Sequence, residues 1–150
     1  MSSHTAPDRI VVGGDEVVVR VSSAETGGAL LAIDVRMHAG GGPPALHRHA
    51  PAEVYRVETG ELTFYDADAG GVVRRATHGP GDVVHIPAGR EHTVRNESGS
   101  AATASVTFVP GGAMERFVRA AGRVPEGATM EDVVALAATH GVEITRPLPG

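Results

Sequence analysis

The chain has no cysteine among its 150 residues, and aromatic residues make up only 3% of it. Without cysteine, neither disulfide bonds nor thiolate metal ligands are available, so a bound metal would have to be held by nitrogen and oxygen atoms. No apolar run approaches the length of a membrane span, and residues 1–8 lack the apolar segment of a secretion signal. These absences predict a cytoplasmic protein.

Positive charge is also sparse. The 13 Lys and Arg residues are not clustered, and the formal net charge is -5 at pH 7. A nucleic-acid partner requires a basic face that neutralises phosphate groups. We therefore expect neither nucleic acid nor a membrane as partner, but a small molecule.

Turn-forming residues are abundant, with 20 glycines and 10 prolines. They separate short runs of strand-forming residues, of which the clearest lie at 30–37, 54–57, 62–65 and 102–109. Many short strands at close spacing favour a sandwich or a barrel. We predict a mainly β fold whose barrel occupies residues 9–111, after a disordered tail over residues 1–8.

Residues 112–150 follow a helical rather than a strand pattern. Apolar residues recur on one helical face over 114–121. Thr129 is the predicted N-cap of a second helix, whose apolar stripe starts at Met130. Because both helices are too short to form a core alone, we expect them to pack on the outside of the barrel. Residues 142–145 are a candidate edge strand.

Two spaced motifs carry the chemistry of the chain. They are Gly41-x5-His47-x-His49-x3-Glu53-x6-Gly60 and Gly81-x5-Pro87-x-Gly89-x2-His92-x3-Asn96. Gly60, Gly81 and Gly89 permit turn conformations that other residues disfavour, and Pro87 is expected to fix the bend before His92. The second block joins the first only when the barrel closes.

The predicted metal ligands are His47, His49, Glu53 and His92. Side chains at i and i+2 of a strand point the same way, so His47 and His49 can meet one ion while Arg48 points outward. Imidazole and carboxylate ligands suit one divalent ion of Fe, Mn, Ni, Co, Cu or Zn per chain. Four ligands leave two positions of an octahedral ion open. A purely structural metal is the alternative, although structural zinc sites favour four closed ligands, usually with cysteine.

The other histidines are expected to lie outside the metal site. Those assigned to ordinary surface or core positions are His4, His38, His78 and His140. The sequence does not fix the strand register, so Arg36, His38 and His85 could face either solvent or the pocket. Glu91 is expected to be exposed.

Side chains that share a strand face with the ligands should surround the metal. The predicted substrate pocket consists of Tyr55, Val57, Leu62, Phe64 and Val94. For the aliphatic members, ordinary core filling is the alternative. The hydroxyl of Tyr55 could donate to a metal-bound oxygen or could serve packing alone. Glu53 and Tyr55 are the candidate catalytic residues.

The two motifs resemble the signature motifs of the cupin superfamily and match both without a gap. Further likeness to bacterial single-domain cupins described as quercetin-dioxygenase-like lies in Thr26-Gly27-Gly28, Pro43-Pro44 and His140-Gly141-Val142-Glu143. The resemblance covers nearly the whole chain from about residue 9. It implies a double-stranded β-helix of the jelly-roll type, a metal site and a homodimer, but it implies the substrate poorly.

Three functions fit these residues. The first is a metal-dependent dioxygenase acting on a small hydroxylated or enolic molecule, with a flavonol as a candidate by resemblance. Glu53 would then either ligate the metal or accept a proton from a substrate hydroxyl. The second is an isomerase, cyclase or lyase that uses the metal as a Lewis acid without oxygen. The third is a non-enzymatic cupin that binds a small ligand, although no DNA-reading segment is expected beside the barrel.

Overall fold

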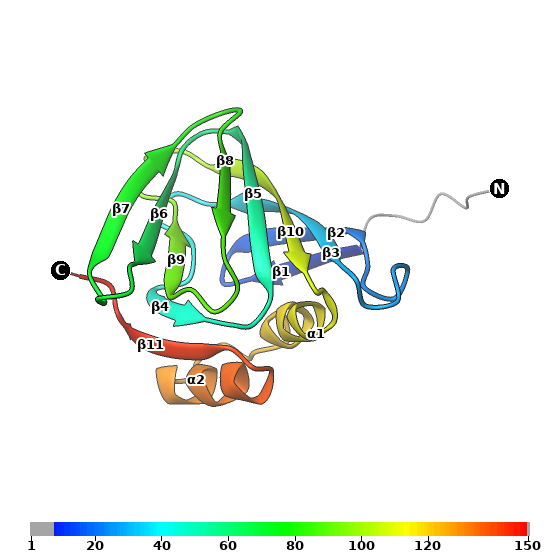
Figure 1. Cartoon of the computed structure of the whole chain (residues 1–150). Helices are drawn as coiled ribbons and strands as arrows, with labels where there is room; N and C mark the ends of the chain where they lie inside the picture. Colours follow the sequence, from blue (N-terminus) through cyan, green and yellow to red (C-terminus); the bar gives the residue numbers. More distant parts are fainter. Residues whose placement is uncertain (1–7, 150) are drawn as a thin grey trace.

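Two antiparallel sheets face each other in the computed structural model, which describes residues 8–149 (Figure 1). The first sheet contains, in spatial order, β1 (Asp8–Val12), β2 (Asp15–Val21), β3 (Leu31–Met37), β10 (Ala102–Val109), β5 (Ala52–Thr59) and β8 (Val83–Ile86). The second contains β11 (Glu143–Pro147), β4 (Ala45–Arg48), β9 (His92–Arg95), β6 (Leu62–Ala67) and β7 (Val73–His78). The predicted mainly β jelly-roll fold is confirmed.

The predicted tail lies mostly outside the described residues. Residues 1–7 are not described, whereas Asp8 already opens β1 and pairs with Val19 on β2. The carboxylate of Asp8 accepts a hydrogen bond from Arg119 on the first helix. The strand β1 thus includes Asp8, a residue predicted to belong to the tail.

The core lies between the sheets because apolar residues alternate with polar ones along the strands. On β10, Ala102, Ala104, Val106 and Phe108 are buried, while the residues between them are more exposed. One core cluster contains Met37, Val57, Leu62, Phe64, Ile86, Val94, Ala102 and Ala104, with Tyr55 packed against it. Four of the five predicted pocket residues are thus fully packed core residues, and their role in a pocket stays a prediction.

The helices α1 (Gly112–Ala121) and α2 (Met130–Thr139) lie at one end of the barrel (Figure 1). Thr129 is the N-cap of α2, as predicted: its side chain accepts from the backbone of Asp132, and the Asp132 carboxylate accepts from the backbone of Thr129. The predicted place of Met130 on the packed stripe is wrong, since this side chain is 52% exposed. No helix within residues 8–149 is long and apolar enough to cross a membrane.

The C-terminal strand β11 completes the second sheet beside β4, in agreement with the candidate edge strand. Ile144 is the register partner of His47. The hydroxyl of Thr145 lies 3.1 Å from the carbonyl of Leu46 and 2.5 Å from the carboxylate of Glu91, and it can donate to either. Arg146 binds the same carboxylate at 2.9 Å. Glu91, expected to be exposed, is therefore held on the outer side of β9 with only 16% of its side chain accessible.

The loop between β3 and β4 is tied down on both sides before it delivers the first two histidines. Asp15 accepts from the backbone N–H of His38 at 3.0 Å and from that of Gly42 at 3.1 Å. Arg95 donates to the carbonyls of Gly40 and Gly42. Asn96, the last residue of the second motif, donates to the carbonyls of Met37 and Ser100. These contacts fix the path of the chain into β4.

The structure also places the three side chains whose direction the sequence left open. Arg36 pairs with Thr103 and His85 pairs with Val54, on the faces that point away from the core. The ring of His38 lies 2.5 Å from Asp15. None of the three takes part in the interior site.

Candidate metal centre

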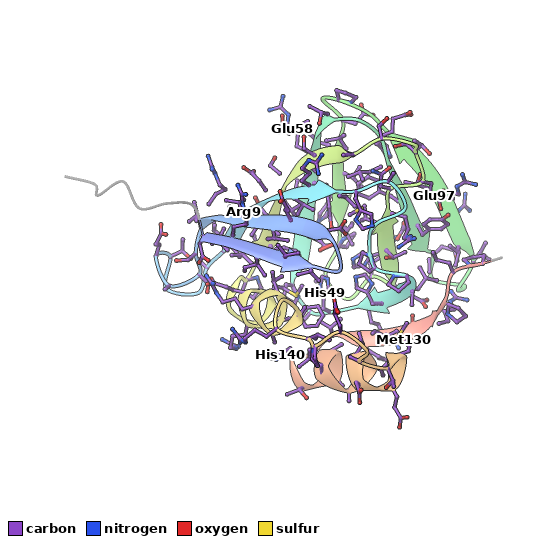
Figure 2. The ribbon with its side chains drawn as sticks, turned by 180° about the vertical axis from the view of Figure 1, so that it is seen from behind. Arg9, His49, Glu58, Glu97, Met130 and His140 are labelled. Atoms are coloured by element: carbon purple, nitrogen blue, oxygen red, sulfur yellow. The ribbon has the colours of Figure 1, made fainter. Side chains whose placement is uncertain are left out.

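Two sheets supply the four predicted ligands. His47 on β4 and His92 on β9 are register partners in the second sheet, and His49 follows directly after β4. Glu53 reaches them from β5 in the facing sheet. The ring centroids of His47 and His92 are 4.5 Å apart, and those of His49 and His92 are 5.2 Å apart. Figure 2 shows His49 between the ribbons near the helical end, with Glu58 at the far end.

The three histidines form a group whose ligand atoms all lie within 4.8 Å of one another. His49 and His92 are buried, whereas His47 remains partly accessible. This is the geometry expected when three nitrogens share one ion. The fold thus brings histidines of the first motif next to the histidine of the second motif, as predicted.

Backbone carbonyls fix the tautomer of each ring. Nδ1 of His49 donates to the carbonyl of Pro51 at 2.8 Å, and Nδ1 of His92 donates to that of Arg90 at 2.7 Å. Nδ1 of His47 lies 3.2 Å from the carbonyl of Ala45. A carbonyl only accepts, so each Nδ1 carries the proton and each Nε2 is left to bind a metal.

The Nε2 atom of His49 shows that this donor set suits a cation. It is one of two buried side-chain polar atoms without a hydrogen-bond partner among the described residues, the other being Nε of Arg95. It faces Oε2 of Glu53 at 3.5 Å. A lone pair and a carboxylate oxygen that face each other in a buried site repel unless positive charge lies between them. The residues present therefore fit a divalent metal ion.

The charges of the ligands follow from their contacts. Burial, helped by the charge of His92, lowers the pKa of His47 to about 4. Burial alone raises the pKa of Glu53, but the neighbouring His49 and His92 outweigh burial and lower that pKa to about 2. Burial alone lowers the pKa of His92, yet the contact with Glu53, at 3.0 Å, outweighs burial and raises it. Glu53 is thus anionic and His47 neutral at neutral pH.

Protons and metal should compete at His92. Its pKa is raised above the ordinary 6.5, so at about pH 6.5 this ring is more than half protonated without metal. Metal affinity should therefore fall as the pH drops through this raised pKa, while His47 stays neutral down to about pH 4. Titration calorimetry with Zn(II) in buffers of different protonation enthalpy should show proton release from His92 at about pH 6.5, and this contribution should shrink as the pH rises through the raised pKa. Absence of proton release at pH 6.5 would remove His92 from the ligand set.

Tyr55 is the one predicted pocket residue with a free polar group near the ligands. It follows Glu53 on the same face of β5, and its ring meets Phe64 edge to face with centroids 5.2 Å apart. Its hydroxyl has no hydrogen-bond partner within residues 8–149 and is not among the fully buried unpaired atoms. Burial, and then the charge of Glu53, raises the pKa of Tyr55 well above 10. The hydroxyl is therefore a protonated donor.

Two surface hollows lie away from this centre. One, of about 360 Å³, lies over the outer face of the first sheet between Glu16, Arg36 and Glu58. The other, of about 270 Å³, lies between α2 and β11. Neither is lined by any of the four ligands.

Comparison with known proteins gives the family. Residues 33–110 match the family model described as the cupin domain. This chain belongs to the cupin family. The matched range includes both motifs and all four candidate ligands of this cupin. No curated protein matches it in sequence.

Solved structures of three enzymes share the fold of this cupin. An oxalate oxidase is 25% identical with a TM-score of 0.57, and the match covers 74% of this chain and 60% of that one. The cupin thus spans about 60% of the length of that enzyme. An oxalate decarboxylase of Bacillus subtilis is 20% identical with a TM-score of 0.64, covering 96% of this chain and 41% of the other. A sugar phosphate isomerase of Silicibacter pomeroyi is 21% identical with a TM-score of 0.56, covering 69% and 71%. The last two show the fold alone.

Proposed function

We propose that this cupin is a metal-dependent dioxygenase of the quercetinase-like kind, acting on a small hydroxylated or enolic molecule. The proposal depends chiefly on the three Nε2 atoms that converge with tautomers fixed by carbonyls. The ligands would be His47, His49 and His92, with Glu53 as the fourth. A divalent transition metal held there supplies Lewis acidity and positions that substrate and dioxygen can share.

Glu53 suits the role of ligand better than that of base. A carboxylate whose pKa is lowered to about 2 is a weak proton acceptor near neutral pH. Its charge also offsets that of the ion within a buried site. Tyr55 would donate a hydrogen bond to a substrate oxygen, because its raised pKa keeps the hydroxyl protonated.

A second candidate is a Lewis-acid isomerase, cyclase or lyase that needs no oxygen. It is favoured by the same Tyr55 hydroxyl, which could deliver a proton to a carbanion or enolate beside an anionic carboxylate. The similarity to a decarboxylase and an isomerase supports the fold, but it does not support either reaction for this chain.

Oxygen uptake separates the two candidates. The protein reconstituted with Fe, Mn, Ni, Co or Cu should consume one dioxygen per product when supplied with a flavonol or another small enolic substrate. Turnover without oxygen uptake would replace the dioxygenase by the second candidate. Binding without turnover under any metal would leave the non-enzymatic cupin.

Tyr55→Phe should slow turnover about 10- to 100-fold at unchanged metal content, because one donor to the reacting oxygen is lost. Tyr65→Phe is the matched control. Tyr65 lies on the neighbouring sheet with its hydroxyl bound to Glu97, away from the ligands. Equal rates in both variants would remove Tyr55 from the reaction.

Homodimer formation and a cytoplasmic location stay predictions. Sedimentation equilibrium would decide the first.

A further inference from the structure

The metal ligands of the second sheet continue into a row of charged residues. His92 on β9 is the register partner of Asp66 on β6, and Asp66 is the register partner of Arg74 on β7. Residues directly opposite in an antiparallel pair share one face, with Cβ atoms roughly 5 Å apart. Asp66 therefore lies on the same face as His92, one strand farther from His47.

Arg90 reaches this row from the loop before β9. It precedes His92 by two residues, and its carbonyl fixes the ring of His92. Its side chain turns to Asp66, with Nη1 donating to both carboxylate oxygens at 3.1 and 2.9 Å. The intervening Glu91 turns the other way, toward β11. Arg90 and the metal ligand thus lie on the same side of the chain.

The ion pair between Arg90 and Asp66 uses only one of the three guanidinium nitrogens of Arg90. Their side chains are 38% and 50% exposed, and exposed ion pairs contribute little to stability. Asp66 takes only Nη1, and within residues 8–149 neither Nε nor Nη2 of Arg90 has an acceptor. Arg74 adds a second guanidinium next to Asp66, and its own ion pair with Asp68 is loose, at 3.9 Å.

We propose that Arg90 binds a carboxylate of the substrate, at the end opposite to the oxygens that meet the metal. The inference rests on the proposed function and narrows its substrate to an acid. Guanidinium offers a planar fork of donors that matches a carboxylate. Asp66 holds this fork beside the centre and leaves two of its nitrogens for the incoming anion.

A pair of 2-hydroxy acids tests this role by binding alone. Lactate and malate offer the metal the same hydroxyl and carboxylate, but malate adds a second, distal carboxylate. Calorimetric titration of the Co(II)-loaded protein should show tighter binding of malate than of lactate. In Arg90→Gln, malate should lose about tenfold in affinity, while lactate and Co(II) affinity stay unchanged.

Arg56→Gln is the matched control. It removes the same charge from the outer face of β5, where Arg56 is 60% exposed and 3.9 Å from Glu58. Its malate affinity should equal that of the unchanged protein. Equal binding of malate and lactate by the unchanged protein, or equal losses in Arg56→Gln and Arg90→Gln, would overturn the inference. Preference for 3-phosphoglycerate over malate would replace carboxylate by phosphate and also overturn it. Failure of the unchanged protein to bind Co(II) would instead contradict the proposed function, and the inference with it.

Discussion

His49→Ala should abolish retention of the metal. His49 is buried, and its Nε2 atom has no protein partner within the described chain other than the facing carboxylate of Glu53 at 3.5 Å. Removal of this ring takes away one of the three convergent nitrogens and leaves only His47, His92 and Glu53 to hold the ion. Loss of an outer partner of a ligand already costs about 10- to 100-fold in affinity, so loss of the ligand should exceed about 100-fold. Elemental analysis after dialysis measures it.

His78→Ala is the control for this variant. The ring of His78 packs against Phe64 with centroids 5.5 Å apart, but it is no part of the three-histidine group. Its metal content should equal that of the unchanged protein. Similar metal content in His49→Ala and His78→Ala would refute the assignment of His49. Circular dichroism of both variants without metal should show the same fold.

Gly42→Ala should destabilise the protein by about 4 kcal/mol, a large part of the stability of a typical domain. Gly42 has φ +103°, which residues with a β-carbon rarely adopt. A β-carbon there would also lie 2.3 Å from the carbonyl oxygen of Val94 and 3.0 Å from Cα of Arg95. Both clashes are with backbone atoms of the segment that carries His92, and these clashes cannot be relieved by a change of side-chain rotamer. Urea unfolding without metal gives the free energy.

Gly40→Ala separates the two causes. Gly40 lies in the same loop with φ +81°, but no atom lies within 4 Å of the position that a β-carbon would take there. Only the cost of a left-handed conformation applies, which is roughly 1–2 kcal/mol. Equal destabilisation by Gly40→Ala and Gly42→Ala would show that the approach to Val94 adds nothing.

The convergence of His47, His49 and His92 could be predicted from the sequence because the spacing within the two motifs indicates it. His47 and His49 are two residues apart on one chain segment, and the glycines of the motifs mark the turns that return the chain: Gly60, Gly81 and Gly89 all have positive φ. Thr129 could be recognised for the same reason, since a capping box is local.

Contacts between distant segments could not be predicted in this way. Glu91 is held by Thr145 and Arg146, more than 50 residues away. Asp66 stands beside His92 only because of the register of β6 and β9, which no local pattern contains. The prediction that Met130 lies on the packed face of its helix was wrong, because residue spacing does not show which face of α2 packs against β11. Two ligands are oriented by the backbone carbonyls of Pro51 and Arg90. Every residue has such a carbonyl, so residue type does not reveal these contacts.

The position of β4 joins the metal centre to the far end of the chain. β4 has a single register pair with β9, between His47 and His92, whereas it has four with β11. The strand that presents the first histidine is therefore held mainly by residues that lie about a hundred positions later. Metal binding and the pairing of β11 with β4 should therefore be linked equilibria. Bound metal should increase the fraction of molecules in which β11 is paired, and pairing of β11 should increase the metal affinity. Changes in β11 that weaken its pairing with β4 should therefore also weaken metal binding, although β11 contains none of the ligands.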